Sequence, residues 1–135
     1  MPLDDWTAYR VNGLAMRMRE AADGVLEPLG LTVKRFGALA TLAERGALAQ
    51  NELGEQLGID RTTMVSLVDD LERAGHVARE RNPADRRAYV IELTAQGEAA
   101  RREAAARLER VERELLSPLS AAERRRFIEL LGRLT

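Results

Sequence analysis

Two clusters of side chains in the middle of the chain have the chemistry needed to bind DNA. The first is a run of polar side chains at Arg61, Thr62, Thr63 and Ser66. Small hydroxyls let a backbone approach base edges, and an arginine can bond to guanine or to phosphate. The start of a helix also favours phosphate, through its free N–H groups and its dipole. We therefore predict that this run opens a DNA-reading helix; the alternative is that these residues only cap a helix.

The second cluster is the arginine-rich stretch that contains Arg79, Arg81, Arg86 and Arg87. An arginine at the tip of a β-ribbon fits a minor groove, where the negative potential of narrow A·T tracts is enhanced. Asp85 makes sense at such a tip if it pairs with one arginine and fixes its direction. The alternative is a solvated charged loop with no ligand.

Short helices and a hairpin are expected to position both clusters. The spacing predicts a helix over Gln50 to Leu57, a turn at Gly58, and a helix over Arg61 to Ala74 that Asp60 caps. Asp69 and Asp70 are expected at the far end of the second helix, away from phosphates. The alternating pattern that follows predicts strands over Val77–Arg81 and Ala88–Leu93, joined by a turn over residues 82–85.

Longer helices flank this region on both sides. We predict helices over about Asp5 to Glu27, from Thr32 to Gly46, from Thr94 to about Leu116, and from Ser120, which opens a capping box with Glu123, to about Leu134. The terminal helices carry apolar residues that either complete the core of one subunit or form a homodimer interface. We favour the homodimer interface. These residues are Leu14, Met18, Leu108, Val111, Leu115, Leu116, Phe127, Ile128, Leu130, Leu131 and Leu134.

Composition excludes several other classes of function. The chain has 135 residues, a formal net charge of −1 and no cysteine, so thiol chemistry and Cys-zinc sites are excluded. Acidic residues dominate before residue 61, whereas residues 73–87 hold five basic and two acidic residues, a local positive island. No apolar run is long enough to span a membrane and no leader pattern opens the chain, so we expect a soluble, cytoplasmic protein.

Catalysis and metal binding find no support in the residue pattern. His76 is the single histidine and follows Gly75 at a predicted helix end, where a structural role is the simpler interpretation. Carboxylates alternate with arginines at helical spacing, as on a solvated helix face. We therefore predict neither an enzyme nor a cofactor or metal site.

From Leu48 to Gly97 the sequence resembles the winged helix-turn-helix of the MarR family of bacterial transcription regulators. The segments LGIDRTTMVSLVDDLERAGHV and RERNPADRRAYVIELTAQG carry the resemblance, and the flanking helices have the right order and length. The resemblance implies a homodimer that binds a pseudo-palindromic DNA operator, usually as a repressor, and is often released by a small aromatic or anionic ligand. By position, Arg61, Thr62, Thr63 and Ser66 are expected to read the major groove. Arg87, oriented by Asp85, is expected to enter the minor groove. Gln50 and Asn51 are expected to contact phosphates.

Three departures from the family pattern bear on mechanism. Ser66 stands where many members carry a larger basic residue, and Ala49 replaces a usual Ser or Thr cap. Without cysteine, peroxide sensing is excluded as a mechanism.

Tyr9 and Arg10 could bind an anionic aromatic ligand by stacking and charge, although ordinary packing of the first helix is the simpler explanation.

The sequence thus predicts a mainly α fold with a small β-hairpin, in which a winged helix-turn-helix is flanked by N- and C-terminal dimerisation helices. We expect a single subunit over 1–135, with a DNA-binding lobe at about 32–97 and dimerisation helices at about 1–30 and 98–135. The alternative function is a winged-helix protein–protein adaptor that does not bind DNA, which an apolar patch on the second helix of the pair would indicate.

Overall fold

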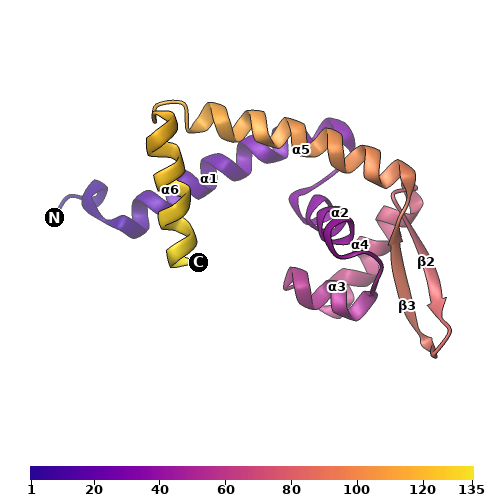
Figure 1. Cartoon of the computed structure of the whole chain (residues 1–135). Helices are drawn as coiled ribbons and strands as arrows, with labels where there is room; N and C mark the ends of the chain where they lie inside the picture. The colour runs from indigo at the N-terminus through magenta and orange to yellow at the C-terminus, as the bar shows by residue number, and fades with distance from the viewer.

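The fold is a winged helix-turn-helix lobe attached to an arm of long helices (Figure 1). The computed structural model describes the backbone of residues 1–135 and every side chain except those of Arg86 and Arg87. Two 3-10 helices, η1 and η2, three strands and six α-helices follow one another along the chain. They are η1 Leu3–Asp5, α1 Thr7–Leu26, η2 Glu27–Leu29, α2 Val33–Arg45, β1 Leu48–Ala49, α3 Gln50–Leu57, α4 Arg61–Arg73, β2 Val77–Asn82, β3 Asp85–Leu93, α5 Ala95–Leu115 and α6 Ala121–Leu134.

Side-chain caps fix where the helices of the lobe and arm begin. Thr32, Asp60 and Ser120 accept hydrogen bonds from the backbone N–H three residues later, as the sequence predicts. Thr94 caps α5 in the same way, and Glu123 returns a bond to the Ser120 N–H to complete the capping box. Because each cap satisfies a backbone donor that the helix cannot, these residues set the helix starts locally.

The sheet is larger than the predicted hairpin. Its strand order is β1-β3-β2, and β1 pairs antiparallel with β3 through Leu48↔Ile91 and Ala49↔Val90. A two-residue strand has no room for an alternating pattern, so the sequence prediction missed it. The hairpin strands also run closer to the turn than predicted, leaving only Pro83 and Ala84 between them.

The core lies in the lobe, where α2, α3 and α4 meet the sheet. Its fully buried members include Leu39 of α2, Leu53 of α3, Val68 of α4 and Ile91 of β3. Ala104 of α5 joins the same cluster, so α5 connects the lobe to the arm. Burial of these side chains holds α3 and α4 in a fixed relative position.

The arm leaves much apolar surface uncovered within one subunit. Figure 1 shows α1 and α5 running alongside each other, with both termini in the half of the molecule away from the hairpin. No residue of α6 is buried, and Ile128, Leu130, Leu131 and Leu134 are exposed on it. At the other terminus Trp6 is 55% exposed. Leu116 is buried and Leu108 packs against the lobe core, so these two predicted interface residues serve the subunit itself.

None of the helices, across the part of the chain with described side chains, is both long and apolar enough to cross a membrane.

Candidate nucleic-acid interface

A close helix pair forms the centre of the site. A Cβ built on Gly54 of α3 would lie 2.9 Å from Met64 Cγ of α4 and 3.1 Å from the Ile59 carbonyl oxygen. Gly58 has φ +66°, which lets the chain turn sharply between the two helices. The two glycines thus allow α3 and α4 to pack closely at a fixed angle.

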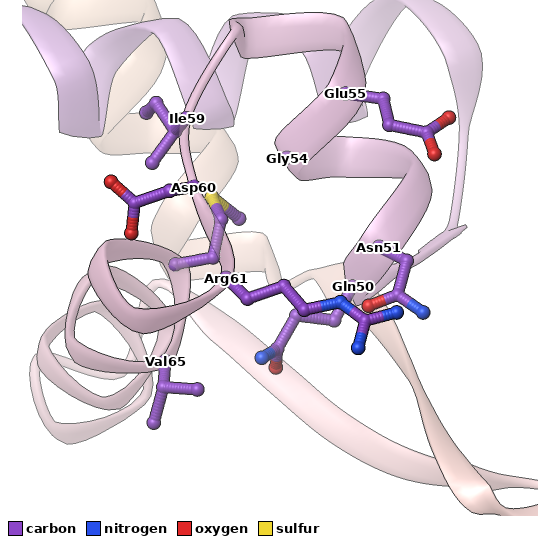
Figure 2. A pocket seen from close by; sticks show the side chains of 9 residues that line it. Gln50, Asn51, Gly54, Glu55, Ile59, Asp60, Arg61 and Val65 are labelled. Carbon is purple, nitrogen blue, oxygen red and sulfur yellow. The ribbon is translucent and has the colours of Figure 1, made fainter.

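An open groove of about 460 Å³ lies between α3 and α4. Figure 2 shows Arg61 extending from the start of α4 toward Gln50 and Asn51 at the start of α3. Asn51 and Arg61 are exposed and Gln50 is half-buried, with its Oε1 shielded from solvent and lacking a hydrogen-bond partner in the described structure. The structure therefore brings together three of the residues that the sequence predicts to bind DNA.

The outer face of α4 is polar with one apolar exception. Arg61, Thr62 and Ser66 are exposed, whereas Met64, Leu67, Val68 and Leu71 are buried against the lobe. Val65 lies on the exposed face and is 48% exposed. The sequence prediction did not name Val65 among the residues of this exposed face, because it considered only polar side chains there.

Thr63 differs from its neighbours because its hydroxyl is already used. Thr63 Oγ1 donates to Asp60 Oδ2 at 2.9 Å, and the Thr63 N–H donates to Asp60 Oδ1 at 2.8 Å. The backbone and hydroxyl donors of Thr63 lower the pKa of the Asp60 carboxyl. Thr63 is therefore committed to the helix cap in the free protein, and Thr62 and Ser66 remain the available hydroxyls.

The two arginines of β2 lie in different environments. Arg81 is exposed, whereas the Arg79 side chain is only 18% exposed and its Nη2 donates to Asp69 Oδ1 at 2.7 Å. The Arg79 guanidinium also lies 5.2 Å from the centre of the Tyr89 ring. The free protein thus ties Arg79 to α4 and β3, although the sequence predicts a DNA contact for it.

The tip of the hairpin is described in part. Asp85 is exposed, begins β3 and is paired in register with Asn82. The predicted roles of Arg86 and Arg87, including the orientation of Arg87 by Asp85, lie outside the described side chains.

Asp69 and Asp70, in the second half of α4, are paired with arginines. Asp70 Oδ2 accepts from Arg35 Nη2 at 2.8 Å and its Oδ1 from Arg73 Nη1 at 3.2 Å, while Asp69 binds Arg79. Pairing offsets the repulsion that two carboxylates on this helix would exert on phosphates.

Tyr9 and Arg10 lie near the start of α1, remote from the lobe of the same subunit (Figure 1). Both are exposed and border an open groove of about 520 Å³ that also includes Asp4 and Arg17. Arg10 Nε donates to the Asp4 carbonyl oxygen at 2.7 Å. In one subunit, therefore, these residues do not face a crevice against the DNA-binding lobe.

His76 is buried, with 9% of its surface exposed, where β2 leaves α4. Burial lowers its pKa, and its Nδ1 has no hydrogen-bond partner in the described structure. Among the residues with described side chains, no three His, Asp or Glu side chains gather as a metal site would require.

Comparisons with known proteins extend over nearly the whole chain. Residues 29–88 match the sequence model of the MarR family. The transcriptional repressor Rv2887 of Mycobacterium tuberculosis is 31% identical over 126 residues, which are 93% of this chain and 88% of that protein. The crystal structure of Rv2887 in complex with DNA has a TM-score of 0.83 at 28% identity and covers 96% of this chain and 97% of its own.

Two further structures are similar to this chain. The transcriptional repressor CouR, bound to a 23-mer DNA duplex, has a TM-score of 0.88 at 28% identity, covering 98% of this chain and 94% of its own. The PcaV regulator of Streptomyces coelicolor, in complex with its natural ligand, has a TM-score of 0.77 at 28% identity, covering 99% of this chain and 94% of its own.

Proposed function

The chain belongs to the MarR family of DNA-binding transcription regulators, and on this premise we propose that it is a homodimeric repressor of a pseudo-palindromic operator. The exposed face of α4, beside the groove with Arg61, Gln50 and Asn51, carries the proposal. Arg61, Thr62 and Ser66 contact base edges in the major groove. Gln50 and Asn51 bind phosphates at the rim.

The hairpin supplies the second contact in this proposal. Arg81 is exposed on β2 and joins Arg86 and Arg87 in the minor groove or on its phosphates. Thr63 and Arg79 support the surface from behind, because both are bonded to acidic residues of the protein.

A homodimer explains the uncovered apolar surface of the arm. Residues at about 1–30 and 98–135 supply the interface, with exposed Ile128 and Leu131 of α6 at its centre. A twofold axis then places two α4 helices on two half-sites of the operator. In this proposal the homodimer acts in the cytoplasm and represses by occupying the operator, which blocks access of the transcription machinery to the promoter.

Release by a small aromatic or anionic ligand is the regulatory part of the proposal. Tyr9 and Arg10 border the same groove, where the Tyr9 ring could stack on an aromatic ligand and the Arg10 guanidinium could pair with its negative charge. In this proposal the second subunit of the homodimer closes that groove. A panel of aromatic acids is expected to include one that raises the melting temperature and releases DNA. If no aromatic acid changes the melting temperature or releases DNA, the protein is a regulator that such ligands do not control.

The adaptor alternative lacks the feature that would mark it. An adaptor requires an apolar patch on α4, yet the exposed face carries Arg61, Thr62 and Ser66 with Val65 as its one large apolar residue. The relatives are transcription regulators and not enzymes, which agrees with the prediction that the chain is not an enzyme.

A gel-shift assay tests the proposal with the DNA upstream of the protein's own gene. We expect a discrete complex that survives excess nonspecific competitor and weakens as salt rises. Arg61→Ala and Arg87→Ala should each weaken it about tenfold or more and make the salt dependence less steep. Arg102→Ala removes an equally charged, exposed side chain of α5 and serves as the control.

Two results would contradict the proposal at different levels. Unchanged affinity and salt dependence in Arg61→Ala would remove that residue from the interface. A wild-type protein that binds no upstream fragment more tightly than competitor would contradict operator binding at its own gene.

A further inference from the structure

Val65 is an apolar side chain in the middle of a polar surface. It lies one turn after Arg61 and is flanked on the exposed face of α4 by Thr62 and Ser66. About half of it is exposed, and it borders the groove that Gln50, Asn51 and Arg61 also line. Figure 2 shows its side chain standing out from α4 with no labelled side chain over it.

Neither helix stability nor core packing explains a valine here. Valine is a poorer helix former than alanine or the long polar residues, because its branched side chain loses rotamer freedom. The buried stripe of α4 is complete without it, since Met64, Leu67, Val68 and Leu71 already face the core. Val65 therefore adds a stiff apolar group to the outside of the helix.

The major groove of DNA offers one apolar group to such a side chain, the C5-methyl of thymine. The other large side chain on this face, Arg61, is a hydrogen-bond donor, and the Thr63 hydroxyl is held by Asp60. Thr62 and Ser66 are short enough for the helix to approach base edges closely around Val65. An apolar contact is then the only kind of base recognition that Val65 itself can make.

We propose that Val65 contacts a thymine methyl group and selects a T·A pair at one position in each operator half-site. This inference rests on the proposed function, because it requires α4 to lie in the major groove. It adds a specificity-determining residue to that function and names the group that is read. A single exposed valine among polar residues is too small a patch to indicate a protein partner instead.

Uracil substitution tests the contact, because deoxyuridine pairs as thymidine does but lacks the methyl group. Each thymine of the operator is replaced in turn, at symmetric positions in both half-sites, and the affinity of the wild-type homodimer is measured. Substitution at one position should weaken binding about 15-fold, since burial of one methyl group is worth about fourfold and each of the two half-sites loses one. The same duplex should change the affinity of Val65→Ala less than twofold.

Val33→Ala is the matched control. Val33 is 46% exposed, but it lies at the start of α2 and does not line the groove. Val33→Ala should keep the full wild-type sensitivity to uracil. If Val65→Ala binds no duplex while remaining folded, Val65→Ser, which also lacks both methyls, replaces it in the comparison.

The inference is overturned if no thymine in the operator is sensitive in the wild type, or if the Val65 variants keep the wild-type sensitivity. Operator binding without any methyl dependence removes this inference alone. A wild-type protein without operator binding removes the proposed function as well, so the two failures are distinguishable.

Discussion

We expect His76 to make the stability of the lobe depend on pH near neutrality. The backbone N–H of His76 donates to the Leu71 carbonyl oxygen at 2.9 Å, and the His76 carbonyl oxygen accepts from the Thr94 backbone N–H at 3.1 Å. The end of α4 and the starts of β2 and α5 therefore meet at this residue. Burial lowers the pKa of its ring below the ordinary 6.5. The fold therefore holds the neutral form of the imidazole.

The sign of the pH dependence follows from this burial. As pH falls from about 7.5 to 5.5, the unfolded chain binds a proton at the ordinary histidine pKa, while the folded chain resists it. The free energy of unfolding should therefore decrease as pH falls through this window. Urea unfolding at several pH values measures it, and His76→Gln should flatten the dependence.

Carboxylates provide an internal control for this measurement. The hydrogen bond from Arg101 lowers the pKa of Glu98 to about 2, so its stabilising contribution is lost only below the ordinary value of 4.5. An equally steep decline in His76→Gln between pH 7.5 and 5.5 would assign the effect to another group.

Local chemistry explains which residues could be predicted from the sequence. Thr32, Asp60 and Ser120 were identified as caps because a cap and its partner lie three residues apart. The Arg79–Asp69 pair spans the turn between α4 and β2, and its formation depends on how the strand packs. Nothing in the local pattern distinguishes such a paired arginine from an arginine that faces DNA.

At the scale of elements, this ion pair joins the hairpin to α4. Asp69 lies on α4 and Arg79 on β2, and Tyr89 of β3 covers the guanidinium. The Arg79 side chain is mostly buried, so solvent screens the pair less than a surface pair. The pair should set the direction in which the hairpin leaves α4.

A double-mutant cycle separates this positioning role from direct DNA contact. If the pair positions the wing, Arg79→Ala and Asp69→Ala should each weaken operator binding, by roughly three- to tenfold, and the double variant should be no worse than either. The affinity and the free energy of unfolding are measured for all four proteins. Stronger binding by Asp69→Ala, with weaker binding by Arg79→Ala, would instead show that Arg79 contacts phosphate directly.

The elements themselves were predictable where their patterns are long. The helix from Thr7 to Leu26 shows apolar periodicity, and the helix from Ala95 to Leu115 begins after the cap residue Thr94. The predicted bounds of both agree with the structure within a few residues. Strand β1 escaped prediction because Leu48 and Ala49 are recognised as a strand only through their partners in β3. Pairing between distant segments leaves no trace in so short a stretch.

At the scale of the whole molecule, α6 carries apolar side chains that the described subunit leaves exposed. The exposed residues Ile128 and Leu131 lie three positions apart, so they share one face of α6. Burying this face against a second copy would cover surface that one subunit leaves in water. A homodimer, as proposed, would therefore complete the arm of the molecule.

Charged substitutions on this face test the homodimer. The variant with Ile128→Asp and Leu131→Asp should be monomeric by light scattering. It should bind the operator about 100-fold more weakly or worse, because two unlinked half-site contacts lose their effective concentration. Val33→Asp on α2 controls for adding an exposed charge. Retention of the wild-type mass by the double variant would place the interface elsewhere.

The exposed tryptophan at the start of the arm has a spectroscopic consequence. Trp6 is the single tryptophan of the chain and directly precedes α1, at the end that the proposed second copy would cover. An indole in water emits at longer wavelength than an indole in an apolar contact. Diluting the protein should therefore shift its intrinsic fluorescence to the red as subunits separate, so that the chain reports its own assembly without an attached dye.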